Sequence, residues 1–182
     1  MTDPVTHLLW GYVVARSLTD RQGYLLLGMM SGVLLDVDAL IPGFTHHGWL
    51  HTPVFVAFLA VTLWGASRER SMLLVPAAAM GSHLVLDSVG GSVMWLWPVS
   101  EASMALVPVA SSAGMAAASV FLFVAPSYGV WDRWKRTGES PIAVLNWVGG
   151  FVPRPVSWGG AGALGLVMVL LAGQRYLLAV MG

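Results

Sequence analysis

Residues 31–52 read SGVLLDVDALIPGFTHHGWLHT, and the prediction of the fold depends on this stretch. Its ionisable residues are two aspartates and three histidines, Asp36, Asp38, His46, His47 and His51. The aspartates lie near the end of an otherwise apolar run, and a charged side chain at the centre of a bilayer costs about 2.5–3.5 kcal/mol. Such a cost requires a compensating partner, and the histidines are the nearest groups that can supply one. The stretch therefore predicts a polar centre built against a hydrophobic helix.

The composition of the chain is that of an integral membrane protein. Of its 182 residues, 57% are hydrophobic and 10% are charged, and the mean hydropathy is +0.74. These proportions are typical of chains with several membrane segments. The chain has no cysteine, so any metal must be bound by nitrogen and oxygen atoms. The formal net charge is zero, and no nucleic-acid partner is predicted.

The apolar segments predict an all-α fold, a polytopic membrane helix bundle with five to six membrane segments plus an interfacial segment. The segments are residues 4–18, 23–44, 50–66, 71–91, 104–125 and 159–181. With a rise of 1.5 Å per residue, a helix of about 20 residues crosses the hydrocarbon core of a bilayer. The segment at 50–66 is at the short limit, and the segment at 4–18 is shorter still.

The whole chain, residues 1–182, is predicted to form a single membrane domain. Its first part, residues 1–100, carries the candidate ligands. Its second part, residues 101–182, supplies the C-terminal helices. Within that part, a cytoplasmic amphipathic connection at about 126–158 combines basic and aromatic residues and is expected to lie on the anionic leaflet.

The basic residues predict how the chain is oriented. They fall in alternate connections between the apolar segments and are Arg16, Arg21, Arg68, Arg70, Arg133, Lys135, Arg136 and Arg154. By the positive-inside rule these connections are cytoplasmic. We therefore expect a multi-pass protein of the cytoplasmic (inner) membrane, with its active site facing the periplasmic or extracellular side.

The spacing of the candidate ligands favours a metal site. His83 and Asp87 are four positions apart, so on a helix both side chains occupy one face and can reach the same ion. Asp36 and Asp38 cannot share a face of a regular helix, so either the helix ends there or only one of them binds metal. His47 and His51 are also four positions apart, but Gly48 favours a loop at this point.

The number of candidates indicates more than one ion. The predicted metal ligands are His7, Asp36, Asp38, His46, His51, His83 and Asp87. Because these residues exceed what one small ion binds, we expect two divalent ions bridged by a carboxylate. Zinc fits a site of mixed histidines and carboxylates, and manganese is the second choice.

The order of these motifs resembles that of a known family. The motifs are Thr6-His7, Leu35-Asp36-Val37-Asp38, His46-His47-Gly48-Trp49-Leu50-His51-Thr52, His83 with Asp87, and Trp97-Pro98. Over residues 6–98 they are similar to the inner-membrane-associated metal-dependent hydrolases, also described as LexA-binding hydrolases or the YdjM-like family. The resemblance implies a multi-span metal-dependent hydrolase with the metal ligands at the matching positions. His47 stands where the family has an arginine.

The predicted function is that of a phosphoesterase, a phosphoric ester hydrolase. Metal ions lower the pKa of bound water and neutralise charge on phosphoryl oxygens, and Asp38 or His47 is the expected proton acceptor. The chain contains no HExxH motif, which excludes the usual zinc-protease arrangement. A membrane lipid is predicted both as the environment and as the substrate, through a phospholipid headgroup or a lipid-linked phosphate at the outer leaflet.

Two other functions, and a structural role for each residue, are alternatives. The same ligands could serve a divalent-cation transporter, or a metal could stabilise a scaffold that has no catalytic role. The aspartates could cap a turn, the loop histidines could be solvated, and His83 with Asp87 could be a buried hydrogen-bonded pair. The oligomeric state is left open by the sequence.

Overall fold

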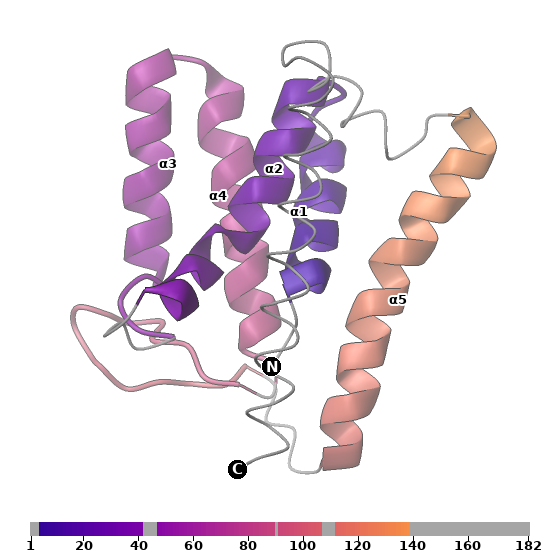
Figure 1. Cartoon of the computed structure of the whole chain (residues 1–182). Helices are drawn as coiled ribbons and strands as arrows, with labels where there is room; N and C mark the ends of the chain where they lie inside the picture. The colour runs from indigo at the N-terminus through magenta and orange to yellow at the C-terminus, as the bar shows by residue number, and fades with distance from the viewer. Residues whose placement is uncertain (1–3, 42–46, 90, 107–111, 139–182) are drawn as a thin grey trace.

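A computed structural model describes residues 4–41, 47–89, 91–106 and 112–138 of the chain (Figure 1). The described residues form five α-helices and one 3-10 helix. These are α1 (Pro4–Leu18), α2 (Gln22–Leu34), η1 (Leu35–Leu40), α3 (Pro53–Ser67), α4 (Arg70–Asp87) and α5 (Ser112–Thr137). His46, the predicted segment at 159–181 and the part of the 126–158 connection after residue 138 lie outside the described residues.

The described part of the chain is all-helical, as the sequence predicts, but the predicted polytopic membrane helix bundle is wrong. In the described ranges, no helix combines the length and the apolar character needed to cross a membrane. α1 and α3 have 15 residues each, which corresponds to about 22 Å of helix against a hydrocarbon core of about 30 Å. The run at 23–44 is divided, because α2 ends at Leu34 and η1 follows. The hydropathy of residues 23–44 predicted one continuous span, whereas the backbone changes from an α-helix to a 3-10 helix at Leu35.

Helices α1 to α4 pack together, and α4 contacts each of the other three (Figure 1). α5 contacts α1 and extends beside the other helices. The indole N–H of Trp10 on α1 donates a hydrogen bond to the carbonyl oxygen of Leu122 on α5, at 2.8 Å. α5 is therefore attached to the bundle through α1.

Glycines allow the backbones of α1 and α2 to touch. A Cβ atom at Gly11 would lie 2.4 Å from the carbonyl oxygen of Gly28, and one at Gly32 would lie 2.5 Å from the carbonyl oxygen of His7. Both separations are far below van der Waals contact, so only glycine fits at this crossing. The close approach places His7 directly beside the last turn of α2.

Two hydrophobic clusters support the bundle. One cluster contains Leu35, Met80 and Leu84 among its buried residues, and the other is formed by Ala15, Leu25 and Val75. The first cluster is continuous in sequence with polar residues, because Leu35 precedes Asp36 and Leu84 follows His83. Packing of these leucines therefore positions the two polar side chains beside them.

Candidate metal centre

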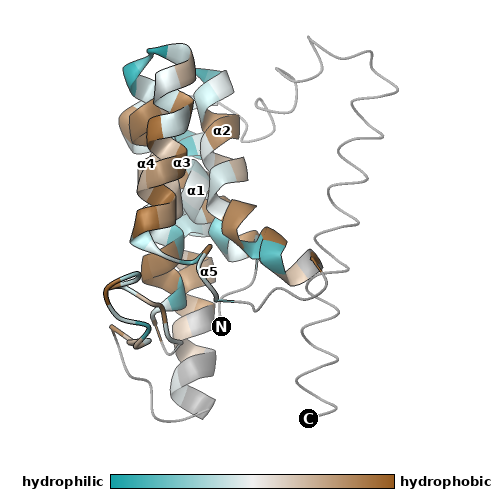
Figure 2. Cartoon of the chain, turned by 90° about the vertical axis from the view of Figure 1, so that its left-hand side faces the viewer, coloured by the Kyte–Doolittle hydropathy of each residue, from teal (hydrophilic) through white to brown (hydrophobic). Residues whose placement is uncertain are grey.

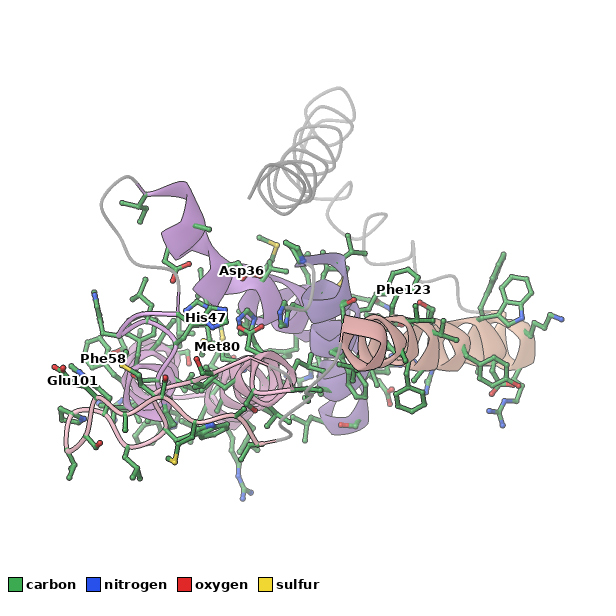
Figure 3. The ribbon with its side chains drawn as sticks, turned by 90° about the horizontal axis from the view of Figure 1, so that it is seen from below. Asp36, His47, Phe58, Met80, Glu101 and Phe123 are labelled. Carbon is green, nitrogen blue, oxygen red and sulfur yellow. The ribbon has the colours of Figure 1, made fainter. Side chains whose placement is uncertain are left out.

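Side chains from four segments meet in the interior of the bundle. α1 contributes His7, η1 contributes Asp36 and Asp38, the turn at 47–52 contributes His47 and His51, and α4 contributes His83 and Asp87. All of them are at most 2% exposed except His47, whose side chain is 12% exposed. In Figure 3, Asp36 and His47 lie on the inner side of the ribbon, whereas the exposed Phe58 and Phe123 lie on the outer surfaces of α3 and α5.

Asp87 is the residue that most of the histidines share. Its Oδ1 lies 3.2 Å from Nε2 of His7, and its Oδ2 lies 3.0 Å from Nε2 of His83. The same Oδ2 is 3.6 Å from Nε2 of His47 and 3.6 Å from Nε2 of His51. Four imidazoles thus direct the same ring nitrogen toward one carboxylate.

Three overlapping groups of residues could each hold a metal ion. They are His7 with His83 and Asp87, Asp36 with His51 and His83, and His47 with His51 and Asp87. Within each group the ligand atoms lie within 4.8 Å of one another. Asp87 belongs to two of the groups and uses both of its oxygens. The arrangement therefore offers more donors than a single four-coordinate ion requires.

Neighbouring acceptors fix the orientation of three imidazoles. Nδ1 of His83 lies 2.7 Å from the carbonyl oxygen of Gly32, and Nδ1 of His47 lies 3.1 Å from the carbonyl oxygen of Ser92. Nδ1 of His51 lies 3.1 Å from Oδ2 of Asp38. Because these oxygens are acceptors, each Nδ1 carries the hydrogen and each Nε2 faces Asp87 with its lone pair when the ring is neutral.

A lone pair directed at a carboxylate oxygen is repelled unless a proton or a metal cation lies between the two. Two atoms bound to one tetrahedral ion at about 2.1 Å are separated by roughly 3.4 Å. The separations of 3.0–3.6 Å between Asp87 and its histidines are close to that value. A proton shared between one histidine and Asp87 fits a single such contact, but a bound cation accounts for several of them at once.

The protonation of the centre suits metal binding at two residues. Burial lowers the pKa of His7, together with the charge of the nearby His83, so the ring of His7 is neutral at physiological pH. Burial by itself would raise the pKa of Asp87, but hydrogen bonds from His7 and His83 outweigh it and hold that pKa below its usual range. A neutral imidazole and an ionised carboxylate are the forms that bind metal. The pKa of His83 is raised, since its contacts with Asp87 outweigh its burial.

The two aspartates of η1 have different surroundings. Asp36 belongs to a group with His51 and His83. Asp38 lies behind His51, on the side of the ring away from Asp87. The α-helix ends before both of them, so of the two possibilities given by their spacing, the structure has the helix end. Asp38 is therefore placed to orient the ring of His51. The sequence predicts it as a metal ligand.

Two groups in the site had no signal in the sequence. They are the backbone carbonyls of Gly32 and Ser92, which accept from His83 and His47. Every residue has a carbonyl group, so no pattern of residue types distinguishes these two. The sequence does show a glycine at position 32, and the absence of a side chain there permits α1 to approach α2. This glycine is the nearest indication in the sequence of the site contact at Gly32.

These features define a class of protein, one whose described part is helical and has a buried centre of imidazoles and carboxylates that could hold divalent metal ions. Residues 1–171 match the sequence profile of the family described as YdjM inner membrane protein. The chain belongs to this family, and the YdjM-like resemblance of its motifs is confirmed. Searches of curated proteins and of solved structures found no match to the chain.

Proposed function

We propose that this protein is a metal-dependent hydrolase of phosphoesters that acts on a lipid or a lipid-linked phosphate at the inner membrane. The observation that carries the proposal is the convergence of four histidine Nε2 atoms on the carboxylate of Asp87. A bound divalent ion would lower the pKa of a water molecule and neutralise charge on the phosphoryl oxygens.

Two ions bridged by Asp87 are the arrangement that these donors favour. One ion would be held by His7, His83 and Asp87, and the other by His51 and Asp87, with the ring of His47 beside it. Zinc is the ion that we propose, since imidazole and carboxylate ligands at these spacings suit it, with manganese as the second choice. Asp38 would act through His51 by holding its ring in place.

His47 marks the side from which a substrate would approach. Its side chain is the only one of the described site residues with more than trace exposure. Its Nδ1 is held by the Ser92 carbonyl at 3.1 Å, so its Nε2 is directed inward. A histidine at the rim can accept the proton that a water molecule loses on attack, and we assign His47 this role.

Exposed apolar surface supports a membrane lipid as environment and substrate. Phe58 and Val61 on α3 are 66% and 53% exposed, and Val120 and Phe121 on α5 are 62% and 68% exposed. Figure 2 shows that most of the length of α3 and α4 is apolar. Large exposed apolar patches mark membrane or protein contacts, and the family is described as an inner membrane protein. The periplasmic orientation of the site stays a prediction.

The test begins with elemental analysis of the detergent-purified chain, followed by an assay of phosphate release from phospholipid and from soluble phosphoesters. We expect about two zinc or manganese ions per chain, and faster cleavage of the lipid substrate. Asp87→Asn should remove most of the bound metal and the activity. Asp20→Asn removes a carboxylate that is 84% exposed and lies outside the centre, so this variant should keep both.

A folded, metal-loaded protein that cleaves no phosphoester would contradict the hydrolase and support the scaffold. Passage of the ion into proteoliposomes without hydrolysis would support the transporter. Equal cleavage of soluble and lipid phosphoesters would keep the enzyme but overturn the proposed substrate.

A further inference from the structure

A cavity of about 550 Å³ lies between α1 and α5, apart from the metal centre. Its lining includes three arginines, Arg16 from α1 and Arg133 and Arg136 from α5. Within the described residues, no aspartate or glutamate lines this cavity. Tyr12 and Val13 contribute an aromatic and an apolar wall. Three guanidinium groups around one cavity form a cationic pocket, with Asp132 on α5 paired to Arg136 at its rim.

One anionic oxygen already bridges two of these arginines. Oδ1 of Asp20 lies 3.2 Å from Nη1 of Arg16 and 3.8 Å from Nη2 of Arg133. The Asp20 carboxylate is 84% exposed, so water screens it and it contributes little to binding energy. An anion inside the cavity can take the place of this oxygen at small cost. The geometry shows that a single oxyanion can bind guanidinium groups from both helices.

An anionic partner would stabilise the buried guanidinium group of Arg16. The side chain of Arg16 is only 8% exposed, and a guanidinium withdrawn from water is stabilised by hydrogen bonds to negative groups. Arginine presents planar pairs of N–H donors that match the oxygens of a phosphate group. A phosphate-bearing ligand therefore matches the pocket in charge and in the type of hydrogen-bond donor.

We propose that this pocket binds a phosphate-bearing anion, either the headgroup of an anionic phospholipid or free phosphate. The pocket is independent of the proposed hydrolytic site. His7 and Arg16 lie at opposite ends of α1, nine positions apart, which is about 14 Å of helix. A ligand held by the arginines is thus too far away to reach the imidazoles with the same phosphate group.

The test measures binding to the full chain after treatment with a chelator, in neutral detergent for inorganic phosphate and after removal of the detergent for vesicles. Inorganic phosphate is titrated by calorimetry, and vesicles of equimolar phosphatidylglycerol and phosphatidylcholine are compared with vesicles of phosphatidylcholine alone. We expect Arg133→Gln and Arg136→Gln each to weaken the affinity roughly tenfold, because each removes a hydrogen bond between charged groups. Both side chains are at the rim, so these variants avoid the folding risk of changing buried Arg16.

Lys135→Gln is the matched control. Lys135 carries the same charge on the same helix, but its ammonium group lies over the ring of Trp131, 5.0 Å from the ring centre, and not in the cavity lining. We expect this variant to bind as the parent chain does. A loss at Lys135 equal to the losses at Arg133 and Arg136 would overturn the pocket in favour of general surface attraction.

The two sources of phosphate give different results. Preference for vesicles with phosphatidylglycerol, with competition by free phosphate, identifies a lipid headgroup. Binding of inorganic phosphate without that preference identifies the free anion. Absence of binding by either, or binding that requires a divalent metal, would overturn the proposal. Since the chelated protein is measured, failure of the hydrolase proposal leaves this result unaffected.

Discussion

At the scale of single residues, His47 combines a strained backbone with a ring in the metal centre. Its φ is +64°, in the left-handed region that favours glycine. The ring nevertheless contacts Ser92 through Nδ1 and Asp87 through Nε2. A side chain that is kept in spite of an unfavourable backbone is a sign of function and not of stability.

This conflict predicts different stabilities for two substitutions at this one position. His47→Gly and His47→Ala both remove the imidazole that we propose as the proton acceptor, so both should lower hydrolytic activity. The glycine variant should be more stable than the alanine variant by about 1 kcal/mol, because alanine keeps the steric penalty of the left-handed backbone. Urea denaturation of the two proteins measures the difference. Equal stability of the pair would mean that the backbone of residue 47 is not strained.

The sequence predicts which residues come together better than it predicts their roles. The spacing of His83 and Asp87 correctly indicates one helix face, and the two residues contact each other at 3.0 Å. The roles of Asp36 and Asp38 depend on where α2 ends and on where His51 lies, which are properties of tertiary structure. Metal binding by any of these residues stays a prediction.

At the scale of the elements, the crossing of α1 and α2 tolerates little increase in side-chain size. A Cβ atom at Gly28 would lie 2.3 Å from Cβ of Ala15 and 2.8 Å from the carbonyl oxygen of Gly11. The backbone atom cannot move away without separating the helices. Since α1 carries His7, the crossing positions part of the metal centre as well as the core.

Alanine at two glycines should therefore change stability in opposite directions. Gly28→Ala should destabilise the fold by about 1–3 kcal/mol through overpacking. Gly81→Ala, on α4, meets no atom within 4 Å, so it should stabilise by up to about 1 kcal/mol through helix propensity. Thermal unfolding followed by circular dichroism distinguishes them. A neutral Gly28→Ala variant would show that α1 and α2 are farther apart than described.

The predicted boundaries of the elements agree best where the sequence has clear start signals. The predicted segment 4–18 coincides with α1, and Pro53 begins α3 after Thr52, whose Oγ1 accepts a hydrogen bond from the N–H of Phe55. The run at 23–44 has no such signal at Leu34, because α-helical and 3-10 segments can be equally apolar. The hydropathy pattern therefore did not indicate the break between α2 and η1.

At the scale of the whole molecule, the metal centre connects parts that are far apart in the chain. It joins α1, η1, the turn at 47–52 and α4. Any ion that binds only the folded protein stabilises it according to its affinity and concentration. An ion bound at this centre should therefore act as a crosslink between these parts.

Addition of zinc to chelated protein should raise the melting temperature. At a concentration of about 100 times the dissociation constant, the gain is about 2.7 kcal/mol, or roughly 5–10 °C for a chain of this size. His83→Gln should remove most of the shift, whereas Asp20→Asn should keep it. Differential scanning calorimetry measures both. A parent chain with the same melting temperature in zinc and in chelator would contradict the metal centre.

The membrane prediction shows the limit of composition as evidence. The amount of apolar sequence indicated the kind of protein, and the family match supports an inner membrane description. The number of spans could not be obtained in this way, because it depends on where each helix begins and ends. Similarly, Arg16 and Arg133 are 117 positions apart in the sequence, and no pattern in it indicates that they share a cavity.

α1 has a polar side chain of a candidate site near each of its ends, with His7 in the metal centre and Arg16 in the cationic pocket. Glycine contacts hold its middle against α2. The distance between the metal centre and the cationic pocket is consequently fixed by one continuous helix, with no hinge between His7 and Arg16. A molecule anchored at the arginines would sit at a constant height relative to the imidazoles, whatever the loops at either end do.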